Sequence, residues 1–197
     1  MTAIPISSPG TLDLAALFEQ GFTYDAFLEK YGNDEQKRRW SQFHGAVKLA
    51  PAHVELLKSF TREMKVFCLA GAWCGDCVNQ CPIFDHFERV NPLVKMRYFD
   101  RDANPELGQK LSVCGGARVP VILFVSEDNF QVGMYGDRTL SKFRQLVGEM
   151  AGAACPTGIV LPGQSQIDGV IQDWLNEFER VQWLLRTSAR LRKVHND

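Results

Sequence analysis

The stretch KVFCLAGAWCGDCVNQCPIF, residues 65–84, contains the pattern that decides the fold. Its first part, KVFCLAG, predicts a buried strand, and the segment after Trp73 predicts a helix. Cys74 is then expected at the N-terminus of this helix, where unpaired backbone N–H groups and the positive end of the helix dipole stabilise a thiolate. The sequence therefore predicts that Cys74 is a nucleophile.

Cys77 follows Cys74 after a two-residue spacer, about one helical turn further along. A thiol in that position can attack a mixed disulfide formed at Cys74 and release the reduced substrate. We therefore interpret Cys77 as the resolving thiol of a redox pair.

The neighbouring cysteines are candidate accessory thiols. Cys81 lies one helical turn beyond Cys77, which allows a second resolving thiol or a glutathionylation site, although small buried cysteines usually behave as hydrophobes. Cys68, inside the predicted strand, is interpreted as core filling, with exchange with Cys77 as the alternative. Cys114 precedes a Gly-Gly turn and is expected to be exposed and open to oxidation.

The composition describes a globular chain of 197 residues, with 45% hydrophobic residues and a formal net charge of -1. No long basic run is present, so we expect neither a nucleic-acid partner nor a membrane partner. The N-terminus lacks a basic start followed by an apolar core, which predicts a cytoplasmic location. Structural disulfides are rare in that compartment, so the cysteines are interpreted as redox-active, metal-binding or buried thiols.

The order of predicted elements divides the chain into three parts. Residues 1–50 predict a helical N-terminal extension, with helix starts at Thr23 and Asn33. Residues 51–150 alternate helices with strands and end in an antiparallel hairpin and a helix, which predicts an α/β fold with a mixed sheet. Residues 151–197 predict a linker and one long amphipathic helix over 167–191, whose apolar stripe faces the core or, as a second hypothesis, a homodimer contact.

The W-C-G-D-C motif between a strand and a helix, together with RVPVILF at 118–124, resembles the thioredoxin family over about residues 51–150. DRDANPEL at 100–107 and GGARVP at 115–120 narrow the resemblance to a bacterial subgroup of thioredoxin-like proteins. The resemblance implies a thioredoxin-like mixed sheet flanked by helices, a kink at Pro82 in the active-site helix, and a cis-proline at Pro120. It also implies a substrate groove, formed by Trp73, Gly75, Val119, Pro120 and Gly136.

The function implied by this resemblance is thiol–disulfide oxidoreduction, and the reading we favour is a cytoplasmic reductase of protein or small-molecule disulfides. The expected electron donor is of the thioredoxin-reductase type, and no cofactor is expected. Two alternatives stay open. One is a metal or iron–sulfur protein that uses Cys74, Cys77, Cys81 and Cys68, and the other is a non-catalytic binding module that uses the groove.

The sequence departs from the family pattern at three positions. Cys68 stands where the family usually carries a buried aspartate that relays a proton to the resolving thiol, and Tyr98 aligns with a lysine near it. A water or the Asp76 carboxylate is expected to substitute. Asp76 should also disfavour the thiolate and make the pair a reductant. Arg118, two residues before Pro120, is expected to offset that charge or to bind an anionic substrate.

Overall fold

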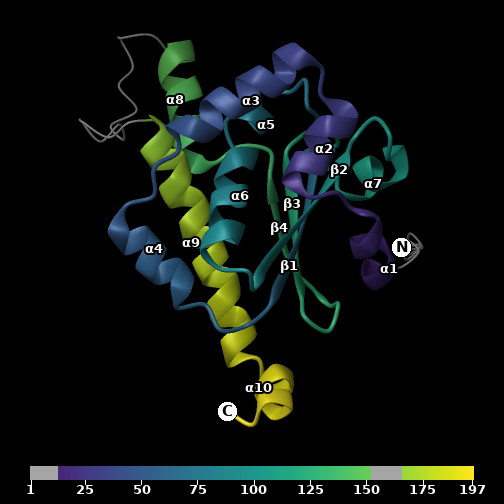
Figure 1. The fold of residues 1–197 in the computed structure, drawn as a ribbon, viewed down its shortest axis with the longest axis vertical. Helices are drawn as coiled ribbons and strands as arrows, with labels where there is room; N and C mark the ends of the chain where they lie inside the picture. Colours follow the sequence, from purple (N-terminus) through teal and green to yellow (C-terminus); the bar gives the residue numbers. More distant parts are fainter. Residues whose placement is uncertain (1–12, 152–165) are drawn as a thin grey trace, which may run out of the picture.

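The computed structural model describes residues 13–151 and 166–197, so the predicted linker lies almost entirely outside the described residues. A four-stranded mixed sheet forms its centre, in the order β2-β1-β3-β4 (Figure 1). β1 (Met64–Ala70) pairs in parallel with β2 (Val94–Asp100), and β3 (Val121–Ser126) runs antiparallel to both β1 and β4 (Gln131–Gly136). The predicted α/β fold with a mixed sheet and a final hairpin is confirmed.

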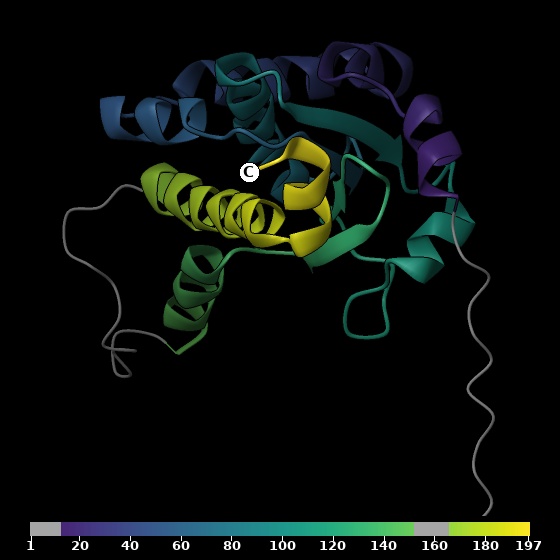
Figure 2. The same ribbon diagram turned by 90° about the horizontal axis from the view of Figure 1, so that it is seen from below.

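Helices cover both faces of this sheet (Figures 1 and 2). On one face, α6 (Cys81–Val90) and α9 (Gln166–Thr187) pack together, and Phe178 of α9 contacts both Phe84 of α6 and Phe124 of β3. On the other face, α1 (Leu14–Gln20) places Phe18 against Phe67 of β1, with ring centroids 5.4 Å apart. α7 (Pro105–Lys110) lies on that second face beside β1.

The N-terminal helices share the core of the sheet. They are α2 (Tyr24–Tyr31), α3 (Asp34–Ala46) and α4 (Pro51–Lys58), and the expected caps form at Thr23 and Asn33. Phe22 exchanges two backbone hydrogen bonds with Tyr98 at the outer edge of β2. Buried aromatic residues of α2 and α3 join the same hydrophobic cluster as Tyr98. The segment before residue 50 is therefore packed into the molecule as part of its core.

The helix after Trp73 differs from the expectation of one helix kinked at a proline. α5 (Gly75–Val78) ends before Asn79 and Gln80, and α6 starts at Cys81. Pro82 lies in the first turn of α6. Backbone N–H groups in a first turn have no acceptor within the helix, so a proline, which lacks the N–H group, removes no hydrogen bond there. The proline thus begins a second helix instead of bending a continuous one.

The C-terminal helix is also divided. α8 (Leu140–Ala151) follows β4, and the expected single helix over 167–191 is wrong, because α9 stops at Thr187 and α10 (Ala189–His195) starts after Ser188. Ser188 has an extended backbone, and Leu191 beyond it is buried. The apolar stripe of α9 faces the core, as expected, and a homodimer contact stays a prediction. In the described part of the chain no helix is long and apolar enough to cross a membrane.

Candidate active site

The short segment between β1 and α5 places Cys74 at the surface of the molecule. The strand stops at Ala70, and Cys74 becomes the N-cap of α5 with an extended backbone, φ -81° and ψ 125°. Cys74 is only partly buried, whereas Cys77, inside α5, has no exposed surface. The two thiols are therefore differently accessible, and an incoming disulfide can meet only Cys74.

The two thiols share protons. Hydrogen bonding to Cys77 is the main cause that raises the pKa of Cys74, and burial adds to it. Burial opposes ionisation of Cys77 as well, but hydrogen bonds from Cys74, Cys81 and the backbone of Gly71 lower its pKa to about 5. Because the two thiols interact strongly, these pKa shifts belong to the pair and not to either residue alone. The pair loses its first proton at a lower pH than an ordinary thiol does, and it loses its second proton at a higher pH.

This acidity makes a testable prediction about pH. The thiolate reacts with iodoacetamide and the thiol does not, so the rate of alkylation falls as the pH drops through the first pKa of the pair. We expect the half-maximal rate below pH 8.5, the midpoint of an ordinary cysteine, because hydrogen bonding within the pair lowers the pKa of its first proton. Stopped-flow alkylation of a Cys114→Ser, Cys155→Ser background gives the profile. A midpoint above pH 8 would contradict the hydrogen-bonded pair.

The loop before β3 lies next to Cys74. The Cys74 thiol donates a hydrogen bond to the carbonyl oxygen of Val119, at 3.5 Å, and the Val119–Pro120 peptide bond is cis, as the resemblance implies. Gly136 of β4 lies directly against this loop and leaves no room for a side chain. A side-chain carbon at Gly136 would lie 2.7 Å from the Pro120 carbonyl oxygen. Its φ of +159° is also one that other residues rarely adopt.

The approach to Cys74 is open on the side of Trp73 and Gly75. The Trp73 side chain is 43% exposed, and the Arg101 guanidinium lies 4.4 Å above its ring. A side-chain carbon at Gly75 would meet nothing within 4 Å. The expected groove residues Trp73, Gly75 and Val119 therefore surround an accessible thiol.

The partner of Asp76 differs from the expected one. Arg138 Nε donates to Asp76 Oδ2 at 2.8 Å, whereas Arg118 pairs with Asp137 Oδ2 at 3.3 Å. Arg118 therefore makes its ion pair away from Asp76, and Arg138 supplies the offsetting charge. Sequence reasoning missed Arg138, although its place two residues after Gly136 put it near the expected groove.

This ion pair predicts a change in redox potential. In Arg138→Gln the Asp76 charge is no longer offset, so the thiolate is disfavoured and the couple becomes more reducing, by about 10–20 mV for a partly exposed pair. Asp76→His should shift the potential in the opposite direction. Equilibration with glutathione buffers measures both, and Arg118→Gln is the matched control. A less negative potential for Arg138→Gln would contradict the electrostatic argument.

Two buried tryptophans tie the terminal helices to the active-site segment. Trp40 of α3 donates its indole N–H to the carbonyl oxygen of Ala72 at 2.9 Å, two residues before Cys74. Trp174 of α9 donates to Gln80 Oε1 at 3.0 Å, and Gln80 Nε2 in turn donates to the carbonyl oxygens of Asp76 and Asp137. The terminal helices therefore hold both ends of the segment that carries the thiols.

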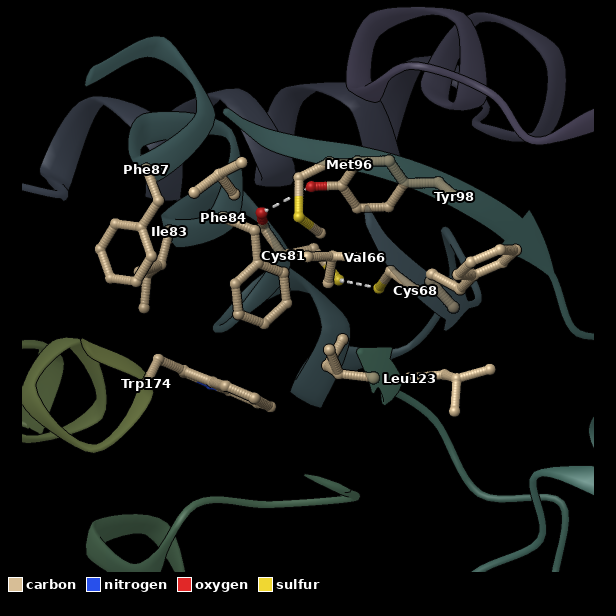
Figure 3. Close-up of a cluster of buried hydrophobic side chains, with 14 of the residues drawn as sticks. Val66, Cys68, Cys81, Ile83, Phe84, Phe87, Met96, Tyr98, Leu123 and Trp174 are labelled. Carbon is tan, nitrogen blue, oxygen red and sulfur yellow. Dashed lines mark hydrogen bonds between the residues drawn. The ribbon is translucent and has the colours of Figure 1, made fainter. Parts of the chain in front are cut away.

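The accessory cysteines occupy two environments. Cys68 and Cys81 are fully buried, and their sulfur atoms lie 3.6 Å apart. Figure 3 shows the two side chains pointing toward each other. Cys114 is exposed and has a φ of 50° beside the Gly-Gly turn. Among residues 13–151 and 166–197, no group of three or more histidine, cysteine or acidic side chains has an arrangement that could hold a metal ion.

Comparison with known proteins identifies a family and two structural relatives. A protein-family model described as Thioredoxin matches residues 21–150. The crystal structure of a protein of unknown function from Pseudomonas aeruginosa aligns over 86% of this chain and 99% of its own, at 21% identity and TM-score 0.67. An HIV epitope-scaffold protein aligns over 84% and 97%, at 22% identity and TM-score 0.62. No curated protein matches this chain.

These two structures are too distant in sequence to show more than the fold. Their alignments nevertheless cover more of the chain than residues 21–150, the part that the family model matches, so the shared fold extends beyond that part.

Proposed function

Because this chain belongs to the thioredoxin family, we propose that it is a thiol–disulfide oxidoreductase that works as a disulfide reductase through Cys74 and Cys77. The observation that carries the proposal is the pairing of a partly exposed thiol with a fully buried one in a shared-proton couple, next to the Val119 carbonyl. An ordinary structural cysteine would need neither the accessibility nor the lowered pKa.

The proposed reaction has two exchange steps. The Cys74 thiolate attacks one sulfur of a substrate disulfide, forms a mixed disulfide, and the other substrate sulfur leaves as a thiolate that takes up a proton. The Cys77 thiolate then attacks Cys74 Sγ, the bond to the substrate breaks, and the Cys74–Cys77 disulfide remains. The substrate gains two electrons and two protons, and a thioredoxin-reductase-type donor restores the dithiol.

The surroundings of Cys74 support a disulfide carried by an extended chain or a small molecule. The exposed Trp73 ring offers an apolar contact, and the open space at Gly75 leaves room for the atoms next to the attacked sulfur. The ion pair of Asp76 with Arg138 leaves the site without a single dominant charge. We propose a cytoplasmic location because the proposed reaction, reduction of disulfides, needs a reducing compartment.

Reduction of insulin with a reductase donor tests the proposal. We expect the reduced B chain to precipitate at a rate proportional to the protein concentration, with turnover limited by the donor. Precipitation no faster than in a mixture without this protein, together with an intact Cys74–Cys77 couple, would contradict a general protein-disulfide reductase and point to a narrower substrate.

A further inference from the structure

Arg118 lies beside the reactive thiol, and its charged group reaches the solvent. It directly precedes Val119, whose carbonyl oxygen accepts the hydrogen bond from the Cys74 thiol at 3.5 Å. The Arg118 side chain is 46% exposed. Neighbouring Cα atoms are about 3.8 Å apart, and an extended arginine side chain is longer than that. A substrate that lies against Val119 and Cys74 is therefore within reach of the Arg118 guanidinium.

The carboxylate that pairs with Arg118 is buried beneath it. Arg118 Nη1 lies 3.3 Å from Asp137 Oδ2, and the Asp137 side chain is only 7% exposed. A guanidinium carries several N–H donors in a planar fork, and this contact uses one of them. In the part of the chain that the structure describes, the other donors of Arg118 have no acceptor. They are available to a ligand that approaches from the solvent.

A bridging glutamine fixes this pair next to the helix that carries the thiols. Gln80 Nε2 donates to the carbonyl oxygens of Asp137 and Asp76, each at 3.1 Å. Asp76 belongs to α5 and lies between the two cysteines of the reactive pair. The backbone at Asp137 is thus connected to α5 through one buried side chain. Arg118 is held on the solvent side of that connection.

The exposed charges near Cys74 are therefore mainly positive. Asp76 is less exposed than its partner Arg138, just as Asp137 is less exposed than Arg118. An incoming disulfide meets guanidinium N–H groups before it meets carboxylate oxygens. Arg138 is bound to Asp76 by a short contact of 2.8 Å, whereas the contact of Arg118 is longer. Arg118 is the guanidinium with more capacity left for a ligand.

We propose that Arg118 selects disulfides that carry a carboxylate close to the attacked sulfur, by binding that carboxylate while Cys74 attacks. This inference rests on the proposed function and names the substrate class for it. A guanidinium matches a carboxylate with two parallel N–H···O hydrogen bonds, which orients the ligand as well as attracting it. Arg118 transfers no proton and no electron, and the two exchange steps stay as described. It is a specificity-determining residue.

The test compares three small disulfides that differ in the charge of their end groups. They are bis(carboxyethyl), bis(hydroxyethyl) and bis(aminoethyl) disulfide, which are anionic, neutral and cationic at pH 7. Each is mixed with reduced protein in a Cys114→Ser, Cys155→Ser background. Acid quenching, alkylation and mass spectrometry give the second-order rate constant for oxidation of the protein. The ratio of variant to unsubstituted protein for each disulfide removes the intrinsic reactivity of the reagent.

Arg118→Gln is expected to slow oxidation by the anionic disulfide about threefold to tenfold. The rate with the neutral disulfide should stay within about twofold, and the rate with the cationic disulfide should rise, because a repelling charge has been removed. Arg118→Lys keeps the charge but loses the fork, so it should restore part of the rate. Added salt should weaken the preference of the unsubstituted protein for the anionic disulfide.

Arg190→Gln is the matched control. Arg190 is 47% exposed and pairs with Asp128, so it resembles Arg118 in exposure and in having a carboxylate partner. It lies in α10, at the end of the molecule opposite α5 (Figure 1). Its removal should leave all three rates unchanged, which separates a local contact from an effect of the net charge.

A pair of peptide disulfides with Asp or Asn next to the cysteine distinguishes two sources of the carboxylate. A loss in Arg118→Gln that is confined to the small anionic disulfide supports a small-molecule substrate. A loss that is confined to the Asp peptide supports an acidic protein segment.

Two results would overturn the inference. One is an unchanged rate in Arg118→Gln with both the small anionic disulfide and the Asp peptide. The other is an equal slowing with the anionic, neutral and cationic disulfides, which indicates a structural role of Arg118. A failure of the proposed function looks different, because the unsubstituted protein would then react with none of the three disulfides.

Discussion

Replacing Cys74 by serine is expected to lower insulin reduction to the rate without protein, a loss of at least about a thousandfold. The serine hydroxyl does not ionise near neutral pH, and the remaining thiol of the pair, Cys77, is fully buried and out of reach of a protein disulfide. The rate of insulin precipitation with a reductase donor measures the effect. The fold should be unchanged, because the two side chains differ by one atom at a partly exposed position.

Cys114→Ser is the matched control, since it removes an exposed thiol elsewhere on the surface and should keep full activity. Cys77→Ser separates the two steps of the reaction. It leaves Cys74 able to attack but removes the resolving thiol, so mixed disulfides with substrates should accumulate. Residual activity in Cys74→Ser would contradict the assignment of the nucleophile, and the absence of any mixed disulfide in Cys77→Ser would favour a non-catalytic binding module.

Trp174→Ala is expected to lower the free energy of unfolding by about 3–5 kcal/mol. Trp174 is fully buried and its ring contacts those of Phe84 and Tyr135, with centroids 4.7 Å and 5.0 Å away. The substitution leaves a large cavity between α9 and α6 and removes the hydrogen bond that orients Gln80. Urea denaturation followed by far-ultraviolet circular dichroism measures the loss.

Trp183→Ala on the same helix provides the control. Trp183 is 49% exposed and its indole donates to Glu179 on the surface of α9, so its removal should cost less than about 1 kcal/mol. Trp174→Phe separates packing from hydrogen bonding, because it keeps most of the apolar volume and leaves Gln80 Oε1 without its donor. Equal losses for Trp174→Ala and Trp183→Ala would contradict the role given to α9.

The central part of the fold could be predicted because its signals are local. Strand β2 coincides with the apolar pattern of residues 94–100, and the caps at Thr23 and Asn33 follow from side chains three residues from their partners. The cysteine pair was placed by the strand before it and the spacing within it. These features depend on neighbours in the sequence, which a single chain displays directly.

The remaining features depend on contacts between distant residues. Arg138 reaches Asp76 across 62 positions, and Trp174 reaches Gln80 across 94. Neither pairing leaves a signal in the sequence next to its residues. In the sequence, Trp174 therefore looks like any other core residue of a terminal helix. The break between α5 and α6 was missed for a related reason, since Pro82 is compatible with either a kink or a new start.

A redox titration of the unsubstituted protein tests the central claim most directly. The reduced chain is equilibrated with glutathione buffers over a range of potentials, its free thiols are alkylated, and peptide mass spectrometry identifies the cysteines that become protected. We predict one reversible two-electron transition in which Cys74 and Cys77 lose two hydrogen atoms together, while Cys68 and Cys81 remain thiols. A stable dithiol at every potential, or a disulfide formed first by any other pair, would contradict the account.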